Sequence, residues 1–143
     1  MSILVWFSKN VDDDKDVILE VARLLIKAGA DIDFKDHHGM TALMYASSRG
    51  YKEVLRFLIY MGTDVNTANK LGGTALMMAS WNGHAEIVQL LFGAGASVDA
   101  VDKDRVNALM MASFRNHDKV VQLLVGAEAS VNVVDNDGNT ALI

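Results

Sequence analysis

One short motif returns along this chain at a constant step, and its period constrains the fold more than any other feature. The motif begins at Thr41, Thr74, Asn107 and Thr140, each 33 residues after the previous one. It reads TALMYAS, TALMMAS, NALMMAS and finally TALI. A segment rich in Asp, Asn and Gly precedes each copy, and segments such as GASVD recur in the same register. An ungapped period over three steps predicts a stack of similar units, each packed on its neighbours.

Each unit contains the signals for a turn followed by two short helices. Thr and Asn at the start of the motif are good N-caps, because their side chains accept a hydrogen bond from an otherwise unpaired backbone N–H. In the third unit, ALMMASWN is expected to form the first helix, which Gly83 breaks. HAEIVQLLFGA is expected to form the second helix, with Ile87, Leu90 and Leu91 on one apolar face and Gly95 at its end. The following SVD is expected to be extended.

This pattern resembles the ankyrin repeat, a unit of 33 residues with a β-turn and two helices. TALMMAS keeps the Thr, Leu and Ala of the family signature Thr-Pro-Leu-His-x-Ala, and GHAEIVQLL and GASVD match the rest of the pattern closely. Ala replaces the signature's Pro, and the chain has no proline at all. Met replaces its His, so we expect Met44, Met77 and Met110 to pack apolarly where the family has a polar network. The resemblance implies an all-α ankyrin-repeat solenoid of stacked helix-turn-helix units joined by β-turn fingers.

The period assigns residues 1–143 to a single ankyrin-repeat domain. Units are expected at about residues 2–33, 34–66, 67–99 and 100–132, with a partial unit at 133–143. The last unit stops within its first helix and supplies no polar outer face. This favours a fragment of a longer array over an apolar end that packs on another molecule.

The first unit carries extra residues around NVDDDKD, between its two expected helices. We interpret them as a solvated loop. A calcium site is the alternative, because Asp12, Asp13, Asp14 and Asp16 cluster there. An EF-hand loop, however, alternates its ligands and needs a mid-loop Gly and a terminal Glu, and this segment has neither.

The fourth unit has other residues where the preceding units have glycine. Arg105 replaces a turn glycine, Asn116 replaces the glycine between the helices, and Glu128 replaces the glycine that closes the second helix. A side chain forced to positive φ costs on the order of 1 kcal/mol, although Asn tolerates this conformation better than most residues. We therefore predict that the fourth unit is the least stable complete unit.

The composition excludes several classes of protein. The chain is 51% apolar and 22% charged, which is typical of a globular protein, and it contains no cysteine for disulfides, thiolate metal sites or nucleophiles. The net charge of −5, with both signs interspersed, argues against a nucleic-acid or membrane surface. We recognise no signal peptide and no apolar run of membrane length, so we expect an intracellular location, cytoplasmic or nuclear.

No catalytic or metal-binding pattern is recognisable. The sequence shows no phosphate-cradling glycine loop, paired catalytic carboxylates or nucleophile elbow. His37 and His38 are adjacent in an expected turn but lack the further ligands of a zinc site. His84 and His117 open second helices, where the family commonly has His. We therefore expect no enzyme activity, no cofactor and no metal.

Trp81 raises the question of whether a large ring belongs to the core or to a binding surface. At 100° per residue it points away from its own unit's core, and Phe114 has the equivalent place in the next unit. We therefore expect two rings side by side on the open side of adjacent helices. Our favoured interpretation is a recognition surface, because large aromatics dominate binding hot spots. The alternative is that each ring covers the flank of a neighbouring unit, over Met77 and Met110.

The resemblance implies that the first helices line a concave surface and that the turns project beside it as fingers. The partner-facing residues implied on the helices are Tyr45, Ser48, Arg49, Met78, Trp81, Asn82, Met111, Phe114 and Arg115. Those implied at the fingers are His37, His38, Met40, Lys70, Leu71, Gly73, Lys103, Asp104 and Val106. Arg49 and Arg115 are also candidates to bind a carboxylate.

We therefore expect a protein–protein interaction module whose preformed surface binds another protein and catalyses nothing. One alternative is a structural repeat that self-associates through its uncapped ends, weakly at the C-terminal end. Another is an engineered binding scaffold, which the irregular turns disfavour. Asn66 and Asn132 occupy the Val-Asn position that ankyrin families present for asparaginyl hydroxylation, so a modification is implied there.

Overall fold

The computed structural model describes residues 15–142, and its helices follow the repeat period. Within these residues the helices are α2 (Lys15–Lys27), α3 (Ala42–Arg49), α4 (Lys52–Tyr60), α5 (Ala75–Trp81), α6 (Ala85–Gly93), α7 (Ala108–Phe114) and α8 (Asp118–Gly126). Residues 15–142 contain no strand. The expected all-α solenoid is therefore confirmed, while the division of residues 1–143 into one domain with the stated unit boundaries stays a prediction.

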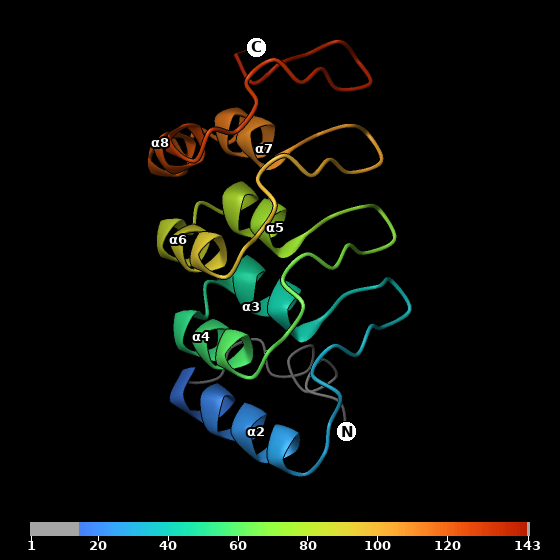
Figure 1. Cartoon of the computed structure of the whole chain (residues 1–143), viewed down its shortest axis with the longest axis vertical. Helices are drawn as coiled ribbons and strands as arrows, with labels where there is room; N and C mark the ends of the chain where they lie inside the picture. The colour runs from blue at the N-terminus through green and yellow to red at the C-terminus, as the bar shows by residue number, and fades with distance from the viewer. Residues whose placement is uncertain (1–14, 143) are drawn as a thin grey trace.

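The helices form two rows that run the length of the stack (Figure 1). In the inner row α3 packs on α5 and α5 packs on α7. In the outer row α2 packs on α4, α4 on α6 and α6 on α8. The turns project as fingers on the side of the inner row that faces away from the outer helices (Figure 1). This arrangement leaves one side of the inner helices open, beside the fingers.

Side-chain caps fix where each inner helix begins. Thr41, Thr74 and Asn107 each accept a hydrogen bond from the backbone N–H three residues later, at 3.3, 3.4 and 2.9 Å. Gly50 and Gly83 follow the first two inner helices with φ of 75° and 74°. The expected boundaries differ slightly, because Asn82, His84 and Ala94 are caps outside α5 and α6 rather than helical residues.

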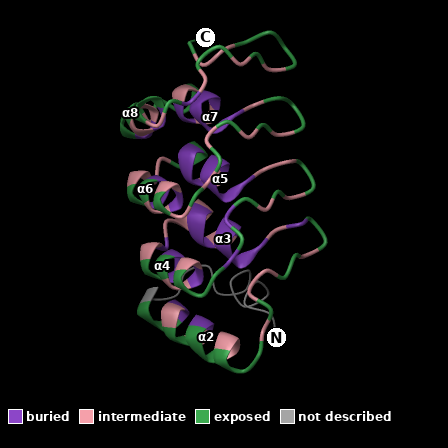
Figure 2. Ribbon diagram, in the orientation of Figure 1, coloured by how far each residue is buried: buried purple, intermediate pink, exposed green. Residues whose placement is uncertain are grey.

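The core lies between the two rows, where the buried residues of the inner helices gather (Figure 2). Met44, Met77 and Met110 are all buried, which confirms their expected apolar packing. Ile87 and Leu91 are buried and Leu90 is half-buried against the same core, which confirms the expected apolar face, and Val88, which was not predicted there, is fully buried as well. The reason is that α6 packs on α5 and also lies between α4 and α8, so the buried arc is centred on Ile87, Val88 and Leu91.

Histidines that precede the outer helices join consecutive units. Nε2–H of His84 donates to the Ser48 carbonyl oxygen at 3.0 Å, and that of His117 donates to the Trp81 carbonyl oxygen at 2.9 Å. Nε2 carries the proton in both cases, since a carbonyl can only accept. The His117 ring lies so close to Gly83 that a Cβ there would be 2.5 Å from Nδ1. Glycine is thus needed between these helices for space as well as for its φ.

The fourth unit adopts the same backbone with other residues at three positions where the third unit has glycine. Arg105, Asn116 and Glu128 have φ of 63°, 59° and 64°, which confirms the expected left-handed conformation. The SVD segment is not extended as expected, because Val98 and Asp99 form a turn and the Ser97 N–H donates to Asn66 Oδ1 of the preceding unit at 2.8 Å.

Both ends of the described chain bear on earlier expectations. Asp12, Asp13 and Asp14 of the acidic cluster, and the first helix expected in the first unit, lie outside the described residues, whereas Asp16 lies in the first turn of α2. Ala141 and Leu142 form a turn instead of the expected start of a helix. No helix between Lys15 and Leu142 is long and apolar enough to cross a membrane.

Candidate protein-binding trough

The four fingers share one internal hydrogen-bond pattern. In each, a side-chain Oδ1 accepts from the backbone N–H groups two and four residues later, at 2.8–3.0 Å. The accepting residues are Asp36, Asn69, Asp102 and Asp135. For Asp135, the backbone hydrogen bond from Asn139 is the largest cause that holds the pKa of the carboxyl below its ordinary value. Each finger therefore has a fixed shape set by its own sequence.

The fingers are also joined to one another. The carbonyl oxygens of His38, Leu71 and Asp104 accept from the backbone N–H groups of the next finger, each at 3.0 Å. The donors are Lys70, Lys103 and Asn136. The finger row is thus a connected wall along one side of the inner helices.

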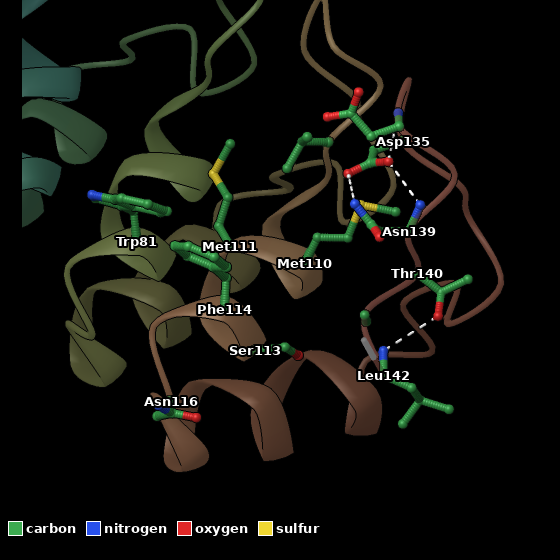
Figure 3. A pocket seen from close by; sticks show the side chains of 13 residues that line it. Trp81, Met110, Met111, Ser113, Phe114, Asn116, Asp135, Asn139, Thr140 and Leu142 are labelled. Atoms are coloured by element: carbon green, nitrogen blue, oxygen red, sulfur yellow. Dashed lines mark hydrogen bonds between the residues drawn. The ribbon is translucent and has the colours of Figure 1, made fainter.

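Trp81 and Phe114 stand side by side on the open side of the inner row, as expected (Figure 3). Their ring centroids are 5.7 Å apart and their planes differ by 10°, so the rings stack. Trp81 retains 38% of its surface exposed and Phe114 76%. The Arg115 guanidinium carbon lies 4.6 Å from the Trp81 ring centroid. Trp81 is therefore partly covered by the next unit and partly open, while Phe114 is mostly open.

The two arginines implied at the helix ends both lie over aromatic rings. Arg49 lies over Tyr45, with its guanidinium carbon 5.2 Å from the ring centroid, as Arg115 lies over Trp81. Burial, followed by the nearby Asp36 carboxylate, raises the pKa of the Tyr45 hydroxyl. Helix α5 packs between α3, which ends at Arg49, and α7, which Arg115 follows, so the two arginines belong to units that are two steps apart.

Two hollows lie between the inner helices and the fingers, and we call them together the inner trough. The middle hollow, of about 390 Å³, is lined by Met40, Ser48, Asn69, Leu71, Gly73, Met77, Met78, Trp81, Asn82, Asp102 and Met111. The terminal hollow, of about 760 Å³, is lined by Trp81, Val106, Met110, Met111, Ser113, Phe114, Asn116, Asp135, Asp137, Asn139, Thr140, Ala141 and Leu142. Trp81 and Met111 line both, so the two hollows are adjacent.

Figure 3 shows the terminal hollow, with the stacked rings of Trp81 and Phe114 on one side. Asp135, Asn139 and Leu142 lie across from the rings, on the last finger and the turn that follows it (Figure 3). Met110 and Met111 project from α7 between the two sides. Aromatic, thioether and carboxylate groups thus surround one open space.

Sequence reasoning located less than half of the residues that line the inner trough. The structure brings Ser48, Leu71, Met78, Trp81, Asn82, Met111 and Phe114 into the hollows, together with Met40, Gly73 and Val106. Sequence reasoning did not assign the other lining residues to a binding surface, and these are Asn69, Met77, Asp102, Met110, Ser113, Asn116, Asp135, Asp137, Asn139, Thr140, Ala141 and Leu142. The period was a signal for Asp137, because Asp137 follows Asp104 by the same 33-residue step. Tyr45, Arg49, Arg115, His37, His38, Lys70, Lys103 and Asp104 line neither hollow.

The histidine pair and the two asparagines singled out in the sequence lie outside the inner trough. The rings of His37 and His38 lie 4.0 Å apart and tilted by 43°, and between Lys15 and Leu142 no three His, Asp or Glu residues are grouped as metal ligands would be. Asn66 is exposed, and its side-chain amide donates to the Gly95 carbonyl oxygen at 3.1 Å. Asn132 is also exposed. Hydroxylation of either asparagine stays a prediction.

Comparison with known proteins agrees with this architecture. Residues 14–102 and 76–143 each match the family model described as ankyrin repeats, in three copies. No curated protein matches the chain. Ankyrin repeats are generally protein–protein interaction modules, and the family is typically non-catalytic. The matched stretches together span nearly the whole sequence, and the chain belongs to the ankyrin-repeat family.

Proposed function

We propose that this chain binds another protein through the inner trough and catalyses no reaction itself. The observation that carries the proposal is the stacked pair of Trp81 and Phe114, which lines the terminal hollow and is partly exposed. Aromatic rings next to a hollow supply large contact areas, and residues of this kind carry much of the free energy of protein binding.

The fingers support the same proposal because they are already ordered. Their side-chain caps and the hydrogen bonds between neighbouring fingers leave little conformational freedom to lose on binding. A surface that is preformed in this way loses less entropy when it meets its partner. The lining of the trough contains no Lys or Arg, which favours a protein over a nucleic acid as the partner. An intracellular location stays part of this proposal, and imaging of the tagged chain tests it.

The experiment is affinity capture from cell lysate with the intact chain and with a double variant, Trp81→Ala and Phe114→Ala. We expect the double variant to lose the captured protein while it keeps its helical circular dichroism. Tyr60→Ala is the matched control, because Tyr60 is 86% exposed on α4 in the outer row. Capture that survives the double variant, or that is lost equally in the Tyr60 variant, contradicts the proposal.

The stability of the single variant Trp81→Ala separates a binding residue from a core residue. The substitution removes the contact of Trp81 with one stacked ring and with one guanidinium group. We therefore expect the free energy of unfolding to fall by about 1–2 kcal/mol. A fall of about 3–5 kcal/mol, which is typical when a buried aromatic is removed, would assign Trp81 to the core. Urea unfolding measures the difference.

Self-association is the second candidate function, and one observation favours it. Leu142 is 91% exposed beside the terminal hollow, on the same side of the molecule as the mostly open Phe114. Apolar groups of this size at one end of a stack provide a contact for a second copy. Sedimentation over a range of concentrations tests this candidate, because a chain that stays monomeric throughout does not self-assemble.

A further inference from the structure

We propose that the inner trough binds an amphipathic α-helix of the partner, with apolar residues on the trough methionines and basic residues beside the terminal finger, residues 133–139. This inference rests on the proposed function and specifies the chemistry of the partner. Three features of the trough carry it: its methionines, its hydrogen bonds and its charge.

Methionine is the most frequent apolar residue in the lining of the trough. Met40, Met77, Met78, Met110 and Met111 contribute to the two hollows. Methionine is unbranched and polarizable, so a surface built from it adapts to apolar side chains of different shapes. Met78 and Met111 are only half-buried, so their side chains are accessible to a partner. This surface suits the apolar face of a helix, which presents side chains at i, i+3, i+4 and i+7.

The hydrogen bonds of the trough favour a helix over an extended peptide. The Asn82 side-chain amide already donates to Ser48 Oγ at 3.2 Å and to the Met78 carbonyl oxygen at 3.0 Å. Asn69 Oδ1 accepts two backbone N–H groups of its own finger. Residues 15–142 offer no strand edge with which a peptide could pair. An extended backbone would therefore bury unpaired N–H and C=O groups on the methionines, whereas a helix satisfies its own.

The charge of the trough favours basic residues in the partner and orients them. Its charged lining residues are Asp102, Asp135 and Asp137. The terminal finger contributes two of these carboxylates and contains no Lys or Arg. Lys70, Lys103 and Arg105 lie on the two preceding fingers, and Arg115 lies over Trp81, so the negative charge is concentrated at the terminal finger. The open ring of Phe114 lines the same hollow and can also contact a cation.

The length of the trough determines the length of the peptide that serves as a probe. Neighbouring helices pack about 8–10 Å apart, so α3, α5 and α7 present roughly 25 Å, which a helix of about 16 residues spans. Three labelled peptides of this length are compared by fluorescence anisotropy at about physiological ionic strength. One has Leu at helical spacing with Lys elsewhere, one replaces Lys by Glu, and one keeps the Lys composition but is broken by central prolines.

We expect the Lys peptide to bind about tenfold more tightly than either of the other two. Combined Met78→Ala and Met111→Ala substitutions should weaken its binding about tenfold, and Asp137→Asn about threefold. Met61→Ala and Glu20→Gln are matched controls on the outer row that should change nothing, since Met61 caps α4 and Glu20 lies on α2. A Glu peptide or a proline-broken peptide that binds equally well overturns the inference, as do controls that weaken binding as much as the trough variants.

Failure of the helix inference is distinguishable from failure of the proposed function. Capture of a protein that depends on Trp81 and Phe114, without binding of the Lys peptide, overturns the helix inference and leaves the proposed function standing. Lys-peptide binding that depends on Met78, Met111 and Asp137 supports the inference.

Discussion

The third and fourth units adopt one backbone with different residues at three equivalent positions. In the third unit Gly72, Gly83 and Gly95 have φ of 81°, 74° and 88°. In the fourth unit Arg105, Asn116 and Glu128 have φ of 63°, 59° and 64°. Because the conformation persists without glycine, it is imposed by the stacking of the units and by their caps. In the fourth unit this conformation costs Arg105 and Glu128 each on the order of 1 kcal/mol, and it costs Asn116 less.

The surroundings of these positions show that glycine is present for two separate reasons. A Cβ on Gly83 would lie 2.5 Å from the His117 ring, whereas a Cβ on Gly95 would meet no atom within 4 Å. Asn116, the fourth-unit equivalent of Gly83, lines the terminal hollow. Space requires glycine at position 83, and backbone conformation alone favours it at position 95.

The largest predicted effect separates these two reasons within the third unit. Gly83→Ala should lower the free energy of unfolding by about 3 kcal/mol, because Ala is strained at positive φ and its Cβ displaces the His117 ring from the Trp81 carbonyl oxygen. Gly95→Ala should lower it by only about 1 kcal/mol, because strain alone acts there. Urea unfolding of both variants measures the difference. Equal losses would show that the contact between His117 and Gly83 does not stabilise the stack.

The reverse substitution in the fourth unit should be stabilising. Glu128 is exposed and has a φ of 64°, so Glu128→Gly should raise the free energy of unfolding by up to about 1 kcal/mol. Arg105→Gly should act in the same direction for the same reason. Thermal and urea unfolding measure both. A fourth unit that is destabilised by either glycine would refute the idea that it stores backbone strain.

Features of the units that depend on residues close together in the chain were predictable from the sequence. The N-caps, the inner methionines and the positive φ of Arg105, Asn116 and Glu128 follow from residue type and period, because each depends on neighbours close in the chain. The position of Trp81 and Phe114 on the open side also followed from helix geometry. Repetition made these predictions stronger, since each local signal occurs several times in one register.

Contacts between units were less accessible to sequence reasoning. The hydrogen bond from His117 to the Trp81 carbonyl oxygen and the position of Arg115 over Trp81 depend on how far one unit is rotated on the next. The full burial of Val88 has the same cause, because α6 contacts helices on several sides. Asp102 and Asp135 look like turn residues in the sequence, and only the stack places them beside a hollow.

A smaller predicted effect compares one serine position in the two units. Ser80 Oγ is buried on α5 without a hydrogen-bond partner, while the equivalent Ser113 on α7 is half-buried and lines the terminal hollow. Ser80→Ala should raise the free energy of unfolding by about 0.5 kcal/mol, because it removes an unpaired buried hydroxyl and improves helix propensity. Ser113→Ala should leave it almost unchanged. Urea unfolding tests the pair, and a clear loss in Ser80→Ala would show that its hydroxyl is hydrogen-bonded in solution.

The smallest predicted effect is local and compares the third-unit finger with the terminal finger in acid. Asn69 caps the former with an amide oxygen, and Asp135 caps the latter with a carboxylate that accepts from the Asp137 and Asn139 N–H groups. The backbone hydrogen bond from Asn139 is the largest cause that lowers the pKa of Asp135 from its ordinary value of 3.8. The stabilisation from this carboxylate is therefore present above pH 3.8 and is lost as the pH falls through the lowered folded value.

Amide NMR signals measure this loss directly. The Asn139 signal should shift as the pH falls below 3.8, while those of Leu71 and Gly73 should not follow the same curve, since Asn69 does not titrate. Asp135→Asn converts the terminal cap into the third-unit type and should remove the titration while it keeps the amide signals of a closed finger. If the Asn139 amide titrates equally in this variant, the carboxylate of Asp135 is not what closes the finger. The two fingers would then owe their common shape to the row of backbone hydrogen bonds between neighbouring fingers rather than to their caps.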